Sequence, residues 1–178
     1  NLLSFPRLWL PVYAVLFMAN TVAAQSVQTP RQTALRFLQE NPAAFGLSAA
    51  DVSDIRVTDE YLTKHNGITH VWVQQQYAGI PVFNGLFGLH VKPDGKVAYL
   101  AHRFVPDIAA RANTTLPSLS ASKALEMAMA NLGFSGFPVP SVRQKVNERN
   151  WIFEGGAVSK TDIPVSICYS VQKDGSVR

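Results

Sequence analysis

The chain has 178 residues, of which 47% are hydrophobic and only 16% are charged, and its formal net charge is +4. This composition excludes a disordered, collagen-like or low-complexity protein and fits one ordinary domain or two small ones. A single cysteine excludes a disulfide framework and a cysteine-based zinc site, because each needs several sulfur atoms. Lysine and arginine are scattered singly along the chain, so we do not expect a nucleic-acid partner.

The first 24 residues predict a secretory signal peptide. Arg7 carries the one charge before an apolar run over residues 8–19, and Val22 and Ala24 are the small residues that signal peptidase requires. We expect cleavage between Ala24 and Gln25. The alternative is a membrane anchor, but the run has about 12 residues and a spanning helix needs about 20. We therefore expect a secreted protein with no stable membrane association after cleavage.

The two ends of the chain suggest a piece of a longer precursor. It begins with Asn1 rather than methionine, and it stops at Arg178, shortly after an Asp174-Gly175 turn. A strand that began after this turn would lack most of its length and leave its partner's backbone groups unpaired. We expect a fragment.

After the signal, a helix followed by an antiparallel meander is predicted. Thr29, Pro30 and Gln32 match a helix N-terminus with a capping box, and Asn41-Pro42 should end this helix. A second capping box, at residues 48–51, should open a short helical turn. Strands are predicted over residues 55–62, 69–77, 86–92 and 97–104, with turns at 66–67 and 93–95.

A similar plan follows a predicted linker. Residues 107–119 contain Pro117 and a polar stretch, which are typical of a linker. Ser120 should cap a helix that Gly133 ends. Strands are predicted over residues 141–146, 150–154 and 163–171, the last with Cys168 as an ordinary strand residue, and the turn at 174–175 parallels the one at 94–95. Two helix-then-sheet modules predict an α+β fold.

No catalytic or metal-binding constellation is expected. The four histidines contain no pair spaced as in H-E-x-x-H. Residues 133–136 lack the second glycine of a nucleophile elbow and follow a helix rather than a strand. We therefore expect no catalytic residue, no metal ligand and no cofactor in this segment, and we do not expect it to be an enzyme by itself.

Residues 69–85, THVWVQQQYAGIPVFNG, resemble the prodomains of secreted zinc metalloproteases of the fungalysin and thermolysin groups. Leu89-His90-Val91 and Asp94-Gly95-Lys96-Val97 fill the positions that follow in that family. The sequence departs from the pattern at residues 76–78 and at Gly88, which interrupts the third strand. Looser matches at 104–111, 117, 124–125, 132–134 and 163–175 favour the fungalysin branch.

This resemblance implies two tandem cystatin-like modules, each a helix packed on an antiparallel sheet. The first, similar to an FTP domain, would cover residues 25–106, and the second, PepSY-like and truncated, residues 120–178. The family's motif residues, which we expect to be structural, are His70, Gln75, Gly79, Pro81, Val82, His90, Asp94 and Gly95.

By the same resemblance, the segment would inhibit the catalytic domain of its own zinc metalloendopeptidase and assist its folding. That domain, which would also hold the zinc, should lie beyond residue 178. The alternative is a free-standing secreted binding or inhibitor module on a cystatin-like sheet, which the residues alone do not separate from a prodomain. A nucleic-acid binder would rest on the positive charge alone.

Overall fold

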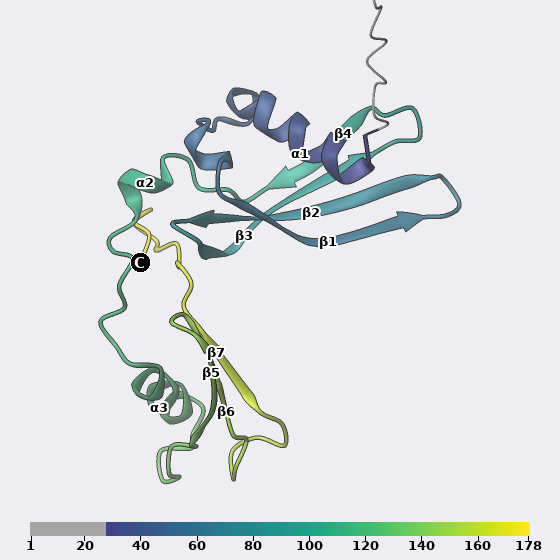
Figure 1. Cartoon of the computed structure of the whole chain (residues 1–178). Helices are drawn as coiled ribbons and strands as arrows, with labels where there is room; N and C mark the ends of the chain where they lie inside the picture. Colours follow the sequence, from purple (N-terminus) through teal and green to yellow (C-terminus); the bar gives the residue numbers. More distant parts are fainter. Residues whose placement is uncertain (1–27) are drawn as a thin grey trace, which may run out of the picture.

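Two antiparallel sheets, each accompanied by a helix, make up the computed structural model, which describes residues 28–178 (Figure 1). The first sheet has the order β1-β2-β3-β4, with bounds Ile55–Thr63, Ile68–Tyr77, Ile80–Val91 and Val97–His102. The second has the order β5-β6-β7, with bounds Val142–Asn147, Asn150–Phe153 and Ile163–Ser166. The predicted α+β class is confirmed. The predicted signal peptide and its cleavage site at Ala24 and Gln25 lie outside the described residues.

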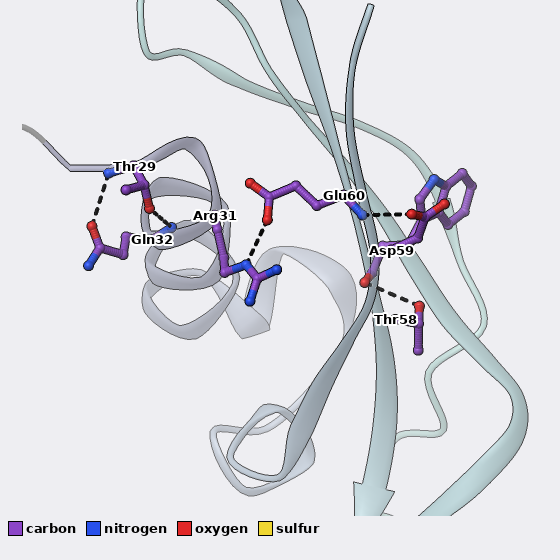
Figure 2. Close-up of polar contacts among 7 residues, drawn as sticks. Thr29, Arg31, Gln32, Thr58, Asp59 and Glu60 are labelled. Carbon is purple, nitrogen blue, oxygen red and sulfur yellow. Dashed lines mark hydrogen bonds and ion pairs between the residues drawn. The ribbon is translucent and has the colours of Figure 1, made fainter.

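Helix α1 (Pro30–Glu40) begins at the predicted capping box. The Thr29 amide donates to Gln32 Oε1 at 2.9 Å, and the Gln32 amide donates to Thr29 Oγ1 at 3.2 Å (Figure 2). Arg31 Nε lies 2.7 Å from Glu60 Oε2 on β1, so an ion pair also fastens the helix to the sheet. This pair is largely exposed and contributes about 0.2–1 kcal/mol to stability.

The first core lies between α1 and the face of β2 and β3 turned towards it. Val71 and Val73 are fully buried and alternate along β2 with half-buried His70 and Trp72, which is the pattern of a strand with one face on a core. Burying each large side chain of this core contributes about 1.5–3 kcal/mol. The buried members of the cluster are Ala34, Leu38, Leu47, Val52, Val71, Val73, Phe87, Leu89, Val91 and Phe104.

Strand β3 starts six residues earlier than predicted, at Ile80 instead of Leu86. Ala78 and Gly79, with φ of 51° and 69°, form a two-residue turn that reverses the chain at once. Tyr77 pairs with Ile80, and Gln76 with Pro81. Tyr77 and Ile80 form the hydrogen-bonded pair that flanks such a turn. The backbone nitrogen of the next residue, Pro81, therefore points away from β2. Because proline has no amide hydrogen to donate, its place here removes no hydrogen bond between β2 and β3.

Helix α3 (Ala121–Asn131) covers the second sheet. As predicted, Ser120 caps it, because the Ser120 Oγ accepts from the Lys123 amide at 3.2 Å. Leu125 and Met129 of the helix pack against Phe153 of β6 in a separate buried cluster. This second cluster and the second sheet are both smaller than the cluster and the sheet of the first half.

The prediction of a third strand over residues 163–171 in this half is wrong beyond Ser166, where β7 ends. The chain leaves the sheet there, and Tyr169 instead joins β3: its amide donates to the Pro81 carbonyl, and the Phe83 amide donates to the Tyr169 carbonyl, both at 2.8 Å. Cys168 is thus an exposed residue of this connection, not of a strand. In Figure 1 the yellow C-terminal segment returns from β7 towards α2.

The turn at Asp174-Gly175 has the hydrogen bonds of the turn at Asp94-Gly95, as their sequences suggest. The Gly95 amide donates to the Lys92 carbonyl at 2.9 Å, and the Gly175 amide to the Gln172 carbonyl at 3.0 Å. Yet the second turn does not close the second sheet. Val177, two residues after Gly175, is buried with Ile80, Val82, Val105, Ile108 and Tyr169.

The segment predicted as a linker starts with helix α2 (Ile108–Arg111). Ile108 is buried, and the Val177 amide donates to the Arg111 carbonyl at 3.1 Å. The module boundaries at residues 106, 119 and 120 stay a prediction. Across residues 28–178, none of the helices has the length and hydrophobicity that crossing a membrane would require.

Candidate functional site

The last four residues of the sequence motif that carries the resemblance form a bulge in β3. Gln74 pairs with Leu86 and Gln76 pairs with Pro81, so the four residues Val82–Gly85 lie opposite the single residue Gln75. We call residues 82–85 the bulge. Bulges of this kind direct side chains away from a sheet and are frequent next to functional sites.

The bulge holds its shape through local contacts. Asn84 has a φ of 58°, a left-handed conformation that asparagine tolerates better than most residues. A Cβ added at Gly85 would lie 2.8 Å from the Val82 Cβ, so the bulge closes too tightly for any other residue at this position. Val82 is buried, whereas Phe83 is 61% exposed. The bulge therefore presents an aromatic ring to solvent.

Gln75, fully buried, fixes the chain that follows β4 beside the bulge. Its Oε1 accepts from the Val105 amide at 2.7 Å, and its Nε2 donates to the Val105 carbonyl at 2.8 Å. The side chain thus bonds to both backbone groups of Val105, as a neighbouring strand would. Its Nε2 also donates to the Asp51 carbonyl at 3.2 Å.

Asp51 is the second buried polar residue of this region. Its carboxylate accepts from the amides of Asp107 at 3.1 Å and Ile108 at 2.9 Å, and from the Ser48 amide and hydroxyl at 2.8 and 2.7 Å. The Asp51 amide donates to Ser48 Oγ at 3.3 Å, so the predicted capping box is present. Burial raises the pKa of Asp51, but the hydrogen bonds from Ser48, Ile108 and Asp107 outweigh it and hold this pKa below its ordinary value.

The bulge and the chain held by Gln75 and Asp51 enclose a groove of about 570 Å³. We call it the bulge groove. Phe104 and Val105 are its buried members, whereas Phe83 and Val171 are substantially exposed. The residues that line it are Phe83, Asn84, Arg103, Phe104, Val105, Pro106, Arg111, Ser170 and Val171.

The other motif residues lie on the β2–β3 turn and at the far end of the sheet. The Gly79 amide donates to Asp54 Oδ2 at 2.7 Å, and a Cβ on Gly79 would meet Arg149 Nη1 at 2.9 Å. Asp94 Oδ1 accepts from the Lys96 amide at 3.1 Å in the exposed β3–β4 turn, where Gly95 has a φ of 79°. We predicted that these residues stabilise the fold and do not bind a ligand, and this stays a prediction.

His70 and His90 face each other across β2 and β3. Their Nδ1 atoms are 2.7 Å apart, and His70 Nε2 lies 2.9 Å from Thr63 Oγ1. A proton on one Nδ1 bonds to the lone pair of the other, whereas two protons would repel each other. Tyr61 stacks on His70, and His90 Nε2 is buried without a hydrogen-bond partner among the described residues. Burial first, and the charge of His70 second, lower the pKa of His90.

We expect acid to destabilise the fold through this pair. Because the folded pKa of His90 is lowered, the unfolded chain takes up the proton first, and stability falls as the pH drops below about 6.5 towards the folded value. In urea unfolding between about pH 8 and pH 5, His90→Gln should show a shallower loss than the wild type. His65→Gln, a change at an exposed histidine, should keep the wild-type slope. Equal slopes for both variants would contradict the assignment.

Sequence reasoning missed the residues that build the bulge groove. Phe83 and Asn84 were part of the quoted motif but were not singled out, although an Asn-Gly pair at 84–85 is a turn signal. Arg103 belongs to no motif, and Arg111 is the last residue of the looser match at 104–111. The two arginines line one groove only in the folded chain. Among residues 28–178, no group of three or more His, Cys, Asp or Glu could hold a metal ion.

Comparison with known proteins supports the resemblance. Residues 53–99 match the Fungalysin/Thermolysin Propeptide Motif, FTP. The matched span contains the bulge, Gln75 and the histidine pair, but it ends before Arg103. The PepSY-like character of the second half stays a prediction.

The chain is similar to extracellular metalloproteinases of Trichophyton and Arthroderma. A probable extracellular metalloproteinase 5 of Trichophyton verrucosum is 26% identical over 126 residues, which cover 68% of this chain and 20% of that protein. The extracellular metalloproteinase 5 of Trichophyton rubrum is 26% identical over 127 residues, with the same coverage. The extracellular metalloproteinase 1 of Arthroderma gypseum is 25% identical over 126 residues. The chain thus spans about one fifth of the length of these relatives.

Proposed function

We propose that this chain is the N-terminal propeptide region of a secreted zinc metalloendopeptidase precursor. In this role it holds the catalytic domain inactive until cleavage and assists its folding. The observation that carries the proposal is the FTP match over residues 53–99, together with extracellular metalloproteinases as relatives. In this proposal the catalytic domain holds the zinc. Among residues 28–178 the structure has no group of three or more His, Cys, Asp or Glu that could hold a metal ion.

Covalent attachment makes modest contacts sufficient for inhibition. A domain tethered to its target encounters it at an effective concentration of about millimolar. Cleavage of the tether removes this advantage, and the fragment then dissociates on dilution. Groups that a partner could contact are present in the described residues, namely the exposed Phe83 and the arginines of the bulge groove.

We expect residues 25–178, added as a separate chain, to inhibit the protease domain encoded beyond Arg178. Inhibition should reach micromolar or tighter affinity, corresponding to about −8 kcal/mol or better. The assay measures peptide hydrolysis by the isolated protease domain at increasing concentrations of the segment. A second assay follows recovery of activity when the denatured protease domain refolds with or without the segment.

The free-standing binding module remains the alternative. A coding sequence with no H-E-x-x-H motif beyond Arg178 would favour it. So would the absence of both inhibition at high micromolar concentration and refolding assistance. A thermally unfolded sample of the segment serves as the control for nonspecific effects of added protein.

A further inference from the structure

We propose that the bulge groove binds an acidic peptide segment that also carries an apolar side chain, and that the protease domain supplies this segment. The second half of this inference rests on the proposed propeptide function. The first half concerns only the chemistry of the groove. It follows from the charge, the exposed apolar surface and the rigidity of the nine lining residues.

The groove is positively charged and has no internal counter-charge. Arg103 and Arg111 both line it and are exposed, and no carboxylate is among the lining residues. Neither arginine takes part in any of the ion pairs within residues 28–178. Asp107, four residues before Arg111, does not line the groove, and its carboxylate forms no ion pair with the Arg111 guanidinium within 4.0 Å. Guanidinium groups bind carboxylates through paired, charge-assisted hydrogen bonds, so acidic side chains are the complementary ligands.

The groove also offers apolar contact. Phe83 is 61% exposed and Val171 is 46% exposed, next to buried Phe104 and Val105. A partner that covers the exposed part of the Phe83 side chain removes apolar surface from water, which favours binding. Aromatic anchors beside arginines are the typical energetic centres of protein interfaces. The ligand therefore needs an aliphatic or aromatic side chain next to its carboxylates.

The walls are fixed before any ligand arrives. Gln75 holds Val105, Asp51 holds the amides of residues 107 and 108, and Tyr169 is bonded to Pro81 and Phe83. A rigid groove loses less conformational entropy on binding than a flexible one. This favours recognition of an extended segment by a preformed surface.

The direct test uses a synthetic pentapeptide in which glutamate alternates with leucine, labelled for fluorescence anisotropy. We expect this peptide to bind residues 25–178, and we expect its affinity to fall as salt is added. The double variant Arg103→Glu/Arg111→Glu should bind the peptide at least about tenfold more weakly. The matched control is Lys64→Glu/Lys160→Glu, which makes the same change of net charge at two exposed positions outside the groove. A peptide with lysine in place of glutamate should not bind.

The apolar half is tested with Phe83→Ser, against Leu62→Ser as the control at another exposed position. We expect Phe83→Ser to weaken both peptide binding and inhibition of the protease domain at least about tenfold. Both variants should keep the wild-type unfolding temperature, because each removes an exposed side chain.

The outcomes separate the two proposals. Equal peptide affinity for the two charge-reversed variants, or no binding to the wild type, overturns the acidic-peptide site even if the segment inhibits the protease. Peptide binding with neither inhibition nor refolding assistance keeps the site and overturns the propeptide function. Dimerisation of the segment that Phe83→Ser abolishes would assign the groove to a second copy and overturn the inference.

Discussion

Replacing Gln75 by leucine is expected to lower the free energy of unfolding by about 3 kcal/mol, because buried backbone groups lose their hydrogen-bond partners while the site stays filled by a side chain of comparable size. Gln75 bonds the Val105 amide at 2.7 Å and the Val105 carbonyl at 2.8 Å, and leucine would leave both groups without this hydrogen-bond partner. Each unsatisfied group costs about 1–3 kcal/mol. Urea unfolding of residues 25–178 followed by circular dichroism measures the change.

Gln76→Leu is the matched control for this variant. Gln76 is the neighbouring glutamine on β2, half-buried, and its side chain forms no hydrogen bond within the described part of the chain. We expect its replacement to change stability by less than about 0.5 kcal/mol. A similar loss for both variants would mean that the Gln75 bonds do not fix the chain after β4. Because Gln75 holds Val105 in the wall of the bulge groove, we also expect the Gln75→Leu variant to inhibit the protease domain more weakly than the wild type at temperatures where the variant is folded.

Asp51→Ala is expected to cost about 3 kcal/mol at neutral pH, since one buried carboxylate accepts four hydrogen bonds. Two of the donors are the amides of Asp107 and Ile108, where the chain enters α2. The difference between wild type and variant should shrink in acid. The lowered folded pKa of Asp51 gives stability that is complete above the ordinary carboxyl pKa and is lost as the pH falls through the folded value.

The control for this experiment is Asp59→Ala, which changes an exposed aspartate on β1. It should change stability by less than about 0.5 kcal/mol at neutral pH. Unfolding curves recorded from neutral pH down to about pH 3 would show whether the Asp51→Ala difference decreases. A difference that stays constant across this range would contradict the role of the ionised carboxylate.

The local elements were predictable because short-range chemistry decides them. The capping box at Thr29 and Gln32 needs only the residues that bond to each other, and the alternation of Val71 and Val73 alone marks the buried face of β2. The Asp-Gly turns at 94–95 and 174–175 likewise depend on their own side chains and on glycine. The motif at residues 69–85 was sufficient for the resemblance that the FTP match supports.

The tertiary structure decided where those elements go. Apolar alternation continues from Ile163 to Val171, so it does not show that the chain leaves one sheet after Ser166 and pairs with β3 through Tyr169. Likewise, the strands predicted at 69–77 and 86–92 leave residues 78–85 outside the sheet, whereas the β2–β3 register makes these residues a turn and the start of a longer β3 that contains the bulge.

The candidate site shows the same division. The sequence by itself determined the motif, the helices and most strands, because local patterns encode local hydrogen bonding and burial. Only the tertiary structure placed Arg103, Arg111 and Val171 around Phe83, and only it bonded Asp51 to residues more than fifty positions away. Such contacts join groups whose positions depend on the path of the whole chain, and no local pattern specifies that path.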